Sequence, residues 1–323
     1  MTNSVATQLR ITIVTPAVRG SHSGNRTTAV RWAGLLRQLG HHVTIATKWQ
    51  NAPSDVLITV HAVKSAEAVL AANADQPGIR IITLLAGTDI YPTFAPGRET
   101  RTALSRADAL LVLQPRAMDL LPAELREKSR TIVQSATATA NPKREAFTAT
   151  VIAHLRPVKQ PHIAVEAMEL LPKNLAMRLI VAGSRLDDGY GQRVANLAKQ
   201  SPRAEWVGAL SRQATKQLIS SSHLCIVPSS AEGGANVVSE AIAAGTPILC
   251  TSIPGNLGLL GDDWPGAFPV GDRTALAALL ERAATENAFF DDLCLRTRKV
   301  QSMVHPNAER LAWHTLLRDL CLI

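Results

Sequence analysis

Residues 224–251 read LCIVPSSAEGGANVVSEAIAAGTPILCT, and this stretch decides the fold. Two short apolar runs, 224–227 and 247–251, enclose a loop and a segment, 236–244, that is predicted to be helical and to end at Gly245. Apolar runs as continuous as these are typical of parallel strands that are buried on both faces. The stretch therefore predicts a strand–loop–helix–strand unit within a doubly wound α/β sheet.

Two glutamates, Glu232 and Glu240, flank the sequence GGANVVS inside this stretch. On one helix they would lie about 12 Å apart along the axis, so they can serve one ligand only if Glu232 precedes the helix. Gly233 and Gly234 predict that placement, because paired glycines stop a helix and let a ligand approach the backbone. Backbone amides at the start of the helix would then point toward a bound phosphate. These amides belong to Ala235, Asn236, Val237 and Val238.

The same alternation of strand and helix extends over nearly the whole chain. Strands are predicted at 9–15, 42–47, 56–61, 79–85, 109–113, 151–155, 177–182 and 205–207, in addition to the two above. Helices are predicted at 27–39, 161–170, 274–284 and 308–322. The pattern pauses at 135–148, SATATANPKREAFT, which we interpret as a linker.

The length of 323 residues and this pause predict two α/β domains, 1–140 and 141–306. Ligands are expected at the carboxyl ends of the strands, in a cleft that both domains face. Hydrophobic residues make up 46% of the chain and charged residues 19%, which excludes a mostly disordered protein. No apolar run reaches the roughly 20 residues of a membrane helix. Because no signal or transit pattern opens the sequence, a cytoplasmic protein is expected, without stable membrane association.

The charge is unevenly distributed along the chain. Residues 1–148 carry 17 basic and 10 acidic side chains, whereas 149–323 carry 17 and 16. A basic first half favours an anionic partner. Aromatic residues are only 4% and no Lys/Arg run reaches five, so a small anionic substrate is favoured over nucleic acid. The four cysteines, none in a CxxC pair, are expected to be free thiols, and no metal site is predicted.

Three further segments follow predicted strands and carry candidate site residues. Residues 154–161, HLRPVKQP, contain Arg156 and Lys159. Residues 15–28, TPAVRGSHSGNRTT, lead into a helix, at whose entrance an anion would be favoured. That entrance is formed by Gly24, Asn25 and Arg26, with His22 as a further candidate contact. Residues 85–93, LAGTDIYPT, contribute Thr88 and Asp89.

Residues 232–240 closely resemble the E-x7-E motif of family 4 glycosyltransferases with the GT-B fold, which consists of two Rossmann-like doubly wound domains facing a cleft. The family grips the diphosphate of its nucleotide-sugar donor with an Arg and a Lys, which Arg156 and Lys159 match. Two fixed cations stabilise a departing diphosphate without a metal, so no metal and no cofactor are expected. The resemblance also implies that residues 307–323 form a helix that returns to the first domain. Many family members have a His near 85–93, where this chain has Gly87, Thr88 and Asp89.

A narrower resemblance joins GSHSGNRTTAVRWA, LLAGTDIY, HLRPVKQP and SSAEGGANVVSEAIAAGTPIL. Together these segments are similar to the selenosugar synthases of selenoneine biosynthesis. That resemblance implies a UDP-sugar donor, UDP-N-acetylglucosamine or UDP-glucose, and selenophosphate as the acceptor. A selenium anion needs no general base, which is compatible with the missing His. Two alternatives stay open: an ordinary family 4 enzyme with a hydroxyl acceptor, and a nucleotide- or nucleic-acid-binding protein without catalysis.

Overall fold

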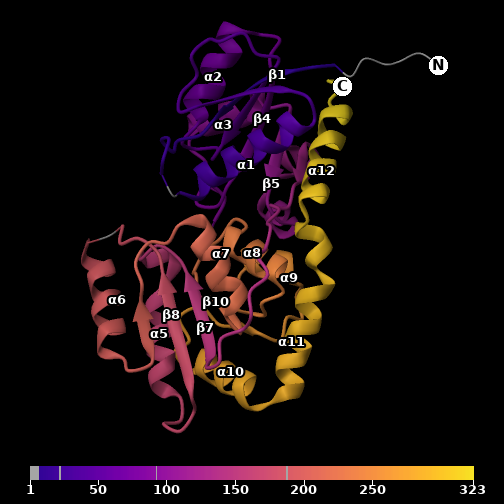
Figure 1. Cartoon of the computed structure of the whole chain (residues 1–323). Coiled ribbons are helices and arrows are strands. Elements are labelled where there is room, and N and C mark those ends of the chain that lie inside the picture. Colours follow the sequence, from indigo (N-terminus) through magenta and orange to yellow (C-terminus); the bar gives the residue numbers. More distant parts are fainter. Residues whose placement is uncertain (1–6, 22, 92, 187) are drawn as a thin grey trace, which may run out of the picture. The chain divides into compact units, whose positions relative to one another are not determined.

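The computed structural model describes residues 7–21, 23–91, 93–186 and 188–323. The chain divides into two units: Met1–Gln134 together with Pro306–Ile323, and Ser135–His305. Each unit is built on one parallel six-stranded sheet with helices packed against it (Figure 1). The chain is therefore an α/β protein with two doubly wound sheets, as the alternating pattern predicts.

The sheet of the first unit has the strand order β2-β1-β3-β4-β5-β6. Its strands are β1 (Arg10–Val14), β2 (His42–Ala46), β3 (Val56–Val60), β4 (Arg80–Leu85), β5 (Ala109–Val112) and β6 (Ser129–Thr131). After β1 the chain adds β2 on one side and then continues on the other side with β3. The winding direction thus reverses between β1 and β3, the position where α/β sheets bind ligands at the carboxyl ends of their strands.

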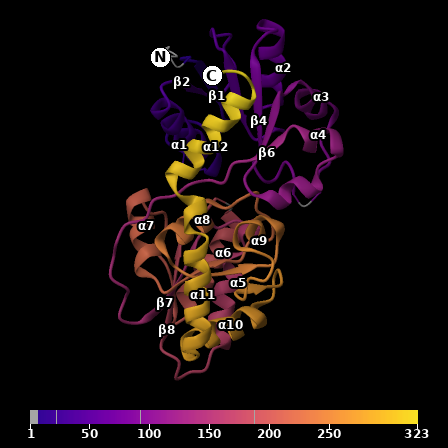
Figure 2. The ribbon, with the colours of Figure 1, turned by 90° about the vertical axis from the view of Figure 1, so that its right-hand side faces the viewer.

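Helices α1 (Gly24–Gln38) and α12 (Pro306–Asp319) pack against each other in the first unit (Figure 2). Alternate strand residues, such as Ile13 and Ile58, join the buried side chains of both helices in one core. The fully buried rings of Trp32 and Trp313 meet edge to face, with centroids 4.9 Å apart. The other helical segments of this unit are α2 (Ala66–Asp75), α3 (Arg98–Arg106), η1 (Pro115–Leu120) and α4 (Ala123–Glu127).

The sheet of the second unit has the order β12-β11-β10-β7-β8-β9, and its winding reverses between β7 and β10. Its strands are β7 (Phe147–Ile152), β8 (Met177–Ala182), β9 (Ala204–Trp206), β10 (Leu224–Val227), β11 (Ile248–Thr251) and β12 (Ala267–Phe268). Its helical segments are η2 (Pro157–Lys159), α5 (Pro161–Leu170), α6 (Asp188–Gln200), α7 (Arg212–Ser221), α8 (Asn236–Ala244), α9 (Pro254–Leu260), α10 (Arg273–Thr285), α11 (Asn287–Lys299) and η3 (Gln301–Val304).

Two predicted elements begin three or more residues away from their observed starts. The strand expected at 151–155 begins earlier, at Phe147, inside the segment interpreted as a linker. Phe147 and Thr148 pair with β8, and the buried Thr148 hydroxyl is satisfied by Ala146 O at 2.8 Å. Residues 147–150, which read FTAT, thus form the first part of a largely buried strand. Helix α1 begins at Gly24 rather than at residue 27, because Ser23 caps it by accepting from Arg26 N at 3.2 Å.

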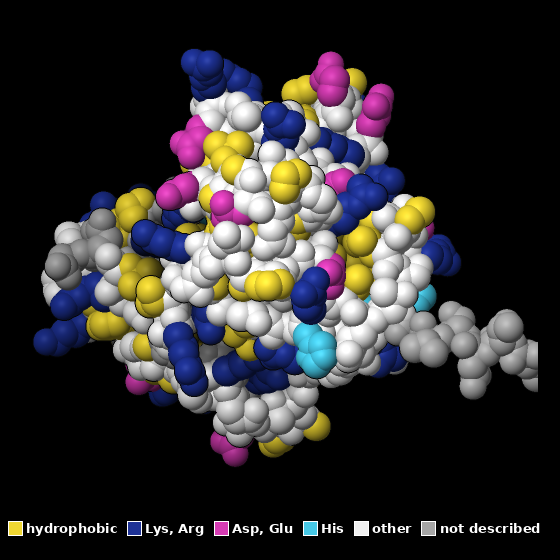
Figure 3. Space-filling view, turned by 90° about the horizontal axis from the view of Figure 1, so that it is seen from above, with side chains coloured by type: hydrophobic (Ala, Val, Ile, Leu, Met, Phe, Trp, Pro, Cys, Tyr) yellow, Lys and Arg dark blue, Asp and Glu magenta, His cyan; other side chains and the backbone are white. Residues whose placement is uncertain are grey.

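Figure 3 shows one face of the molecule, on which Lys and Arg side chains lie in separate groups among uncharged and acidic ones. Within the described residues, no helix combines the length and the apolar character that crossing a membrane requires. The described cysteines are all free thiols.

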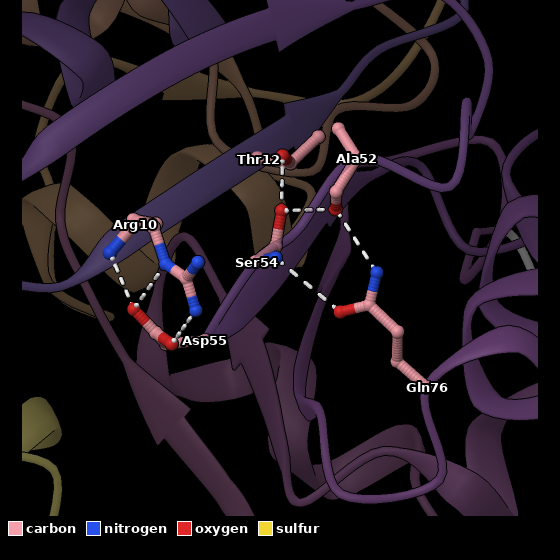
Figure 4. A network of polar contacts seen from close by, with 6 residues as sticks. All are labelled: Arg10, Thr12, Ala52, Ser54, Asp55 and Gln76. Atoms are coloured by element: carbon pink, nitrogen blue, oxygen red, sulfur yellow. Dashed lines mark hydrogen bonds and ion pairs between the residues drawn. The ribbon is translucent and has the colours of Figure 1, made fainter.

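Figure 4 shows a polar network at the amino-terminal edge of the first sheet, opposite the edge where ligands are expected. Arg10 of β1 binds Asp55, just before β3, with Nη2 2.7 Å from Oδ1. Thr12 and Ser54 link the same two chain segments through their hydroxyls, 2.7 Å apart. The hydrogen bonds from Arg10 hold the pKa of Asp55 below its usual value. This network fixes β1 against β3, and so helps to align the loops at their other ends.

Candidate functional site

The loops that follow β7 and β10 lie side by side where the second sheet reverses its winding. Ser230 N, after β10, donates to Val158 O, after β7, at 2.9 Å. The loop after β7 turns into α5 at Gln160, which has the left-handed φ of 45°. Gly183, after β8, packs so closely that a Cβ there would lie 2.0 Å from Ala153 O. These close contacts fix the loop that carries Arg156 and Lys159.

Lys159 and Glu232 form an ion pair across these two loops. Lys159 Nζ lies 2.5 Å from Glu232 Oε1, and the Ser229 hydroxyl donates to the same oxygen at 2.6 Å. The Glu232 side chain is 7% exposed and that of Lys159 is 20% exposed. Arg156 is exposed. Lys159 and Glu232, which the sequence predicts to act on one ligand, are therefore in contact. The exposed Arg156 lies on the same loop as Lys159.

A second set of residues, at the end of β11 and the start of α9, contacts and supports the Glu232 loop. Thr251 Oγ1 donates to Ser229 O at 2.5 Å, and Asn256 Nδ2 donates to Thr251 Oγ1 at 3.1 Å. Gly255 packs against the Glu232 carbonyl, since a Cβ at Gly255 would lie 2.0 Å from that oxygen. The position of Glu232 is thus set by β10 and by the start of α9 together.

Helix α8 begins at Asn236, so Glu232, Gly233 and Gly234 lie on the preceding loop, as the paired glycines predict. Ala235 is the N-cap residue and supplies no side-chain cap. The Val238 amide donates to Ala235 O at 3.0 Å and is therefore already used inside the helix. Val237 and Glu240 are half-buried on the helix. Glu240 lies close enough to Lys216 to act on its pKa, which burial lowers and this carboxylate raises.

The predicted acceptor-side residues all lie at the carboxyl edge of the first sheet. Gly24, Asn25 and Arg26 form the first turn of α1. After β4, Thr88 is exposed whereas Asp89 is buried and accepts three backbone N–H bonds. His22 lies outside the described residues.

Sequence reasoning missed the residues that hold others in place. Ser229, Thr251 and Gly255 contact Glu232 or its loop, Asn256 holds Thr251, and His61 contacts Thr88. The signal for the first group was the segment TSIPGN directly after a buried strand, at the same sheet edge as the glutamate loop. Among the described residues, no group of three or more His, Cys, Asp or Glu side chains is arranged to hold a metal ion.

Solved structures with the same fold are numerous. HepE from Anabaena, solved in complex with UDP and glucose, matches with a TM-score of 0.77 at 14% identity, over 97% of this chain and 100% of its own. Sucrose-phosphate synthase from Thermosynechococcus elongatus matches with a TM-score of 0.80 at 18% identity, over 98% and 99%. A glycosyltransferase from Rickettsia africae matches with a TM-score of 0.76 at 14% identity, over 97% and 99%. These likenesses assign the GT-B fold to the chain.

Among curated protein sequences, none matches the chain. The sequence model of the family described as "Glycosyl transferases group 1" matches residues 135–299. This match spans the whole glutamate segment, the Arg156–Lys159 loop and slightly more than half of the chain, and it agrees with the fold. The chain belongs to the group 1 glycosyl transferases.

Proposed function

We propose that this protein transfers a sugar from a UDP-sugar to selenophosphate. The selenium attacks the anomeric carbon of the sugar, and the bond from that carbon to the UDP oxygen breaks. UDP leaves with the bonding electrons. Water then cleaves the Se–P bond of the product, which releases phosphate and a 1-selenosugar. The donor sugar in this proposal is N-acetylglucosamine or glucose.

One observation carries the donor half of the proposal: Lys159 pairs with Glu232 at 2.5 Å where the second sheet reverses its winding. An ammonium group has three N–H donors, so Lys159 can hold Glu232 and still bind a diphosphate oxygen. Arg156 would bind the same diphosphate. Both cations stabilise the charge that UDP gains as it leaves, without a metal or another cofactor.

The remaining donor contacts follow from the loop and helix around the pair. Glu232 would accept hydroxyl groups of the sugar, and Glu240 those of the ribose. Gly233 and Gly234 let the sugar phosphate approach the backbone, next to the start of α8. HepE, which shares the fold, was solved with UDP and glucose and also with UDP-glucose, which supports a UDP-sugar as the donor here.

The acceptor half rests on the resemblance to selenosugar synthases and on charge. Two segments carry the resemblance in the first unit. GSHSGNRTTAVRWA enters α1 at the carboxyl edge of the first sheet, and LLAGTDIY follows from the end of β4 at the same edge. Residues 1–148 hold 17 basic against 10 acidic side chains, which favours an anionic acceptor. A selenium anion is already nucleophilic, so the reaction needs no base to deprotonate it.

The test is an anaerobic incubation with UDP-N-acetylglucosamine or UDP-glucose, with and without selenophosphate, read by mass spectrometry. The expected result is a selenium isotope pattern on a sugar and UDP release that depends on selenophosphate. UDP-sugar binding without any selenosugar would keep the donor half and return the acceptor to a hydroxyl compound. Salt-sensitive binding of a polynucleotide without UDP-sugar binding would overturn both halves.

A further inference from the structure

A buried carboxylate, a buried imidazole and an exposed hydroxyl lie next to one another at the carboxyl edge of the first sheet. His61 follows β3, and Thr88 and Asp89 follow the neighbouring strand β4. His61 is only 5% exposed and adopts a φ of 78°, which a residue with a side chain rarely accepts. Such strain persists only where surrounding contacts enforce it, and it is concentrated at functional sites.

The carboxylate at the inner end is saturated by backbone donors. Asp89 Oδ2 accepts Ala62 N at 2.8 Å and Ala86 N at 3.0 Å, while Oδ1 accepts Gly87 N at 2.6 Å. Asp89 therefore clamps the ends of β3 and β4 together. It stands 3.5 Å from His61 Nδ1, beyond the usual hydrogen-bond distance.

A backbone N–H indicates which nitrogen of His61 carries the proton. Lys64 N–H points at Nδ1, with 3.4 Å between the two nitrogens, and we infer from this long contact that Nδ1 presents its lone pair. Burial lowers the pKa of His61, which keeps the ring neutral near pH 7. In a neutral imidazole with an unprotonated Nδ1, the proton lies on Nε2. Nε2 is 3.1 Å from Thr88 Oγ1 and therefore donates to that oxygen.

This arrangement leaves the hydroxyl proton of Thr88 for a ligand. Because Thr88 Oγ1 already accepts from His61, its own O–H is directed to another acceptor, and Thr88 is exposed. The exposed ammonium group of Lys64 lies close enough to His61 to lower its pKa, whereas the Asp89 carboxylate acts on that pKa in the opposite sense. A hydroxyl group that donates its proton suits an anionic oxygen rather than a hydroxyl group that must lose its proton.

We propose that Thr88 donates a hydrogen bond to an oxyanion of the phosphate type on the acceptor, and that His61 positions this donor. The inference rests on the proposed function and narrows its acceptor to a compound with a phosphoryl group. Selenophosphate belongs to that class. The opposite tautomer would make Thr88 a hydrogen-bond acceptor and would instead suit a hydroxyl substrate with His61 as its base.

The first test observes the tautomer directly. The full chain with ¹⁵N-labelled histidine is studied by NMR at pH 7.5, and His61→Asn identifies the His61 signals by their loss. The expected spectrum shows an unprotonated Nδ1 and a protonated Nε2 for His61. A protonated Nδ1 would overturn the proposal. This measurement is made on the wild-type protein, so it does not depend on how well a variant folds.

The second test titrates the labelled protein with inorganic phosphate and follows the His61 signals. Wild type and Thr88→Ser should respond, whereas Thr88→Val should bind phosphate at least about tenfold more weakly, as expected for a lost hydrogen bond to a charged group. Thr102→Val, at an exposed threonine of α3, is the matched control and should bind as wild type does. Equal phosphate affinity in Thr88→Val would contradict the proposal.

Kinetics separate this inference from the proposed function. If wild type forms a selenosugar, Thr88→Val should raise the KM for selenophosphate about tenfold and leave the KM for the UDP-sugar unchanged. If wild type forms none but phosphate still shifts the His61 signals through Thr88, the proposed function fails and the oxyanion site stands. If selenosugar forms equally well in Thr88→Val, the site is wrong and the function stands.

Discussion

At the scale of single residues, the Glu232 carboxylate depends on its neighbours for position. The Ser229 hydroxyl donates to Glu232 Oε1 at 2.6 Å and is itself buried. We expect Ser229→Ala to weaken UDP-sugar binding about tenfold, because a hydrogen bond to a charged group contributes roughly 1.5–3 kcal/mol. Isothermal titration calorimetry with the UDP-sugar measures the change.

The adjacent serine offers a matched control for that experiment. Among the described residues, the Ser230 hydroxyl donates its hydrogen bond to Val158 O, at 3.3 Å, rather than to Glu232. We expect the affinity of Ser230→Ala for the UDP-sugar to stay within about a factor of three of the wild-type affinity. Substitutions away from key contacts usually change the free energy by no more than about 0.5 kcal/mol. Equal losses in both variants would show that the loop, rather than the Ser229 hydroxyl, matters for binding.

The two charged residues that frame the donor site should affect different kinetic constants. Lys159→Ala removes the cation that we propose stabilises the leaving diphosphate, so kcat is expected to fall about 100-fold, with Lys159→Arg recovering part of the loss. Glu240→Ala removes the proposed ribose contact, which would be made equally in the ground and transition states, so it should mainly raise the KM for the UDP-sugar. Steady-state kinetics distinguish the two patterns, and unchanged turnover in both would refute the assignment.

At the scale of elements, the start of α9 holds the Glu232 loop through direct backbone packing. A Cβ at Gly255 would lie 2.0 Å from Glu232 O and 2.8 Å from Glu232 Cβ, so Gly255→Ala must displace one of the two segments. We expect a loss of about 1–3 kcal/mol in stability together with weaker UDP-sugar binding. Gly34 lies inside α1, and a Cβ added there would meet no other atom within 4 Å. Gly34→Ala should therefore leave stability unchanged or raise it by up to about 1 kcal/mol. Thermal unfolding compares the two variants.

The attachment of α12 to α1 depends on a buried acid. Glu309 is 1% exposed, accepts Trp32 Nε1 at 2.8 Å and pairs with Arg31 at 3.1 Å. Glu309→Gln can keep the bond to Trp32 but removes the negative charge that is paired with the buried guanidinium of Arg31. We therefore expect a loss of about 3 kcal/mol in stability, seen as a lower urea midpoint of tryptophan fluorescence. Arg310→Gln, exposed on the same helix, should shift that midpoint little.

The sequence predicts an element well when neighbouring residues determine it, and poorly when contacts with distant segments do. The strand at 224–227, the helix at 236–244 and the placement of Glu232 before that helix follow from apolar runs and glycines, and the structure has all three. The start of β7 was missed, because residues 147–148 follow a segment with Asn141-Pro142 and mixed charges that is typical of a linker, and their pairing with β8 is not visible in the local sequence. The support from Gly255 and His61 was missed because it depends on contacts between segments far apart in sequence.

At the scale of the whole molecule, histidines in both units have the same structural role. Four of them use Nδ1 to accept a backbone N–H, which only an unprotonated nitrogen can do. The pairs are His41 with Leu9 N (3.3 Å), His61 with Lys64 N (3.4 Å), His154 with Ser184 N (3.3 Å) and His223 with Thr148 N (3.1 Å). Burial lowers the pKa of His41, His61 and His223. The folded chain therefore requires these rings to be neutral.

This requirement predicts how stability depends on pH. Since these pKa values lie below the unfolded value of about 6.5, the unfolded chain binds more protons as the pH falls through that value. Stability should therefore be full well above pH 6.5 and decline as the pH falls through and below that value, so it should be lower at pH 5.5 than at pH 7.5, and the ion-paired Asp55 stays charged at both. Urea unfolding at the two pH values measures the decline. The double variant His41→Asn/His223→Asn places a non-titrating oxygen near each Nδ1, one in each unit, and should reduce the pH dependence. If the double variant loses as much stability as wild type between the two pH values, buried neutral histidines are not its cause.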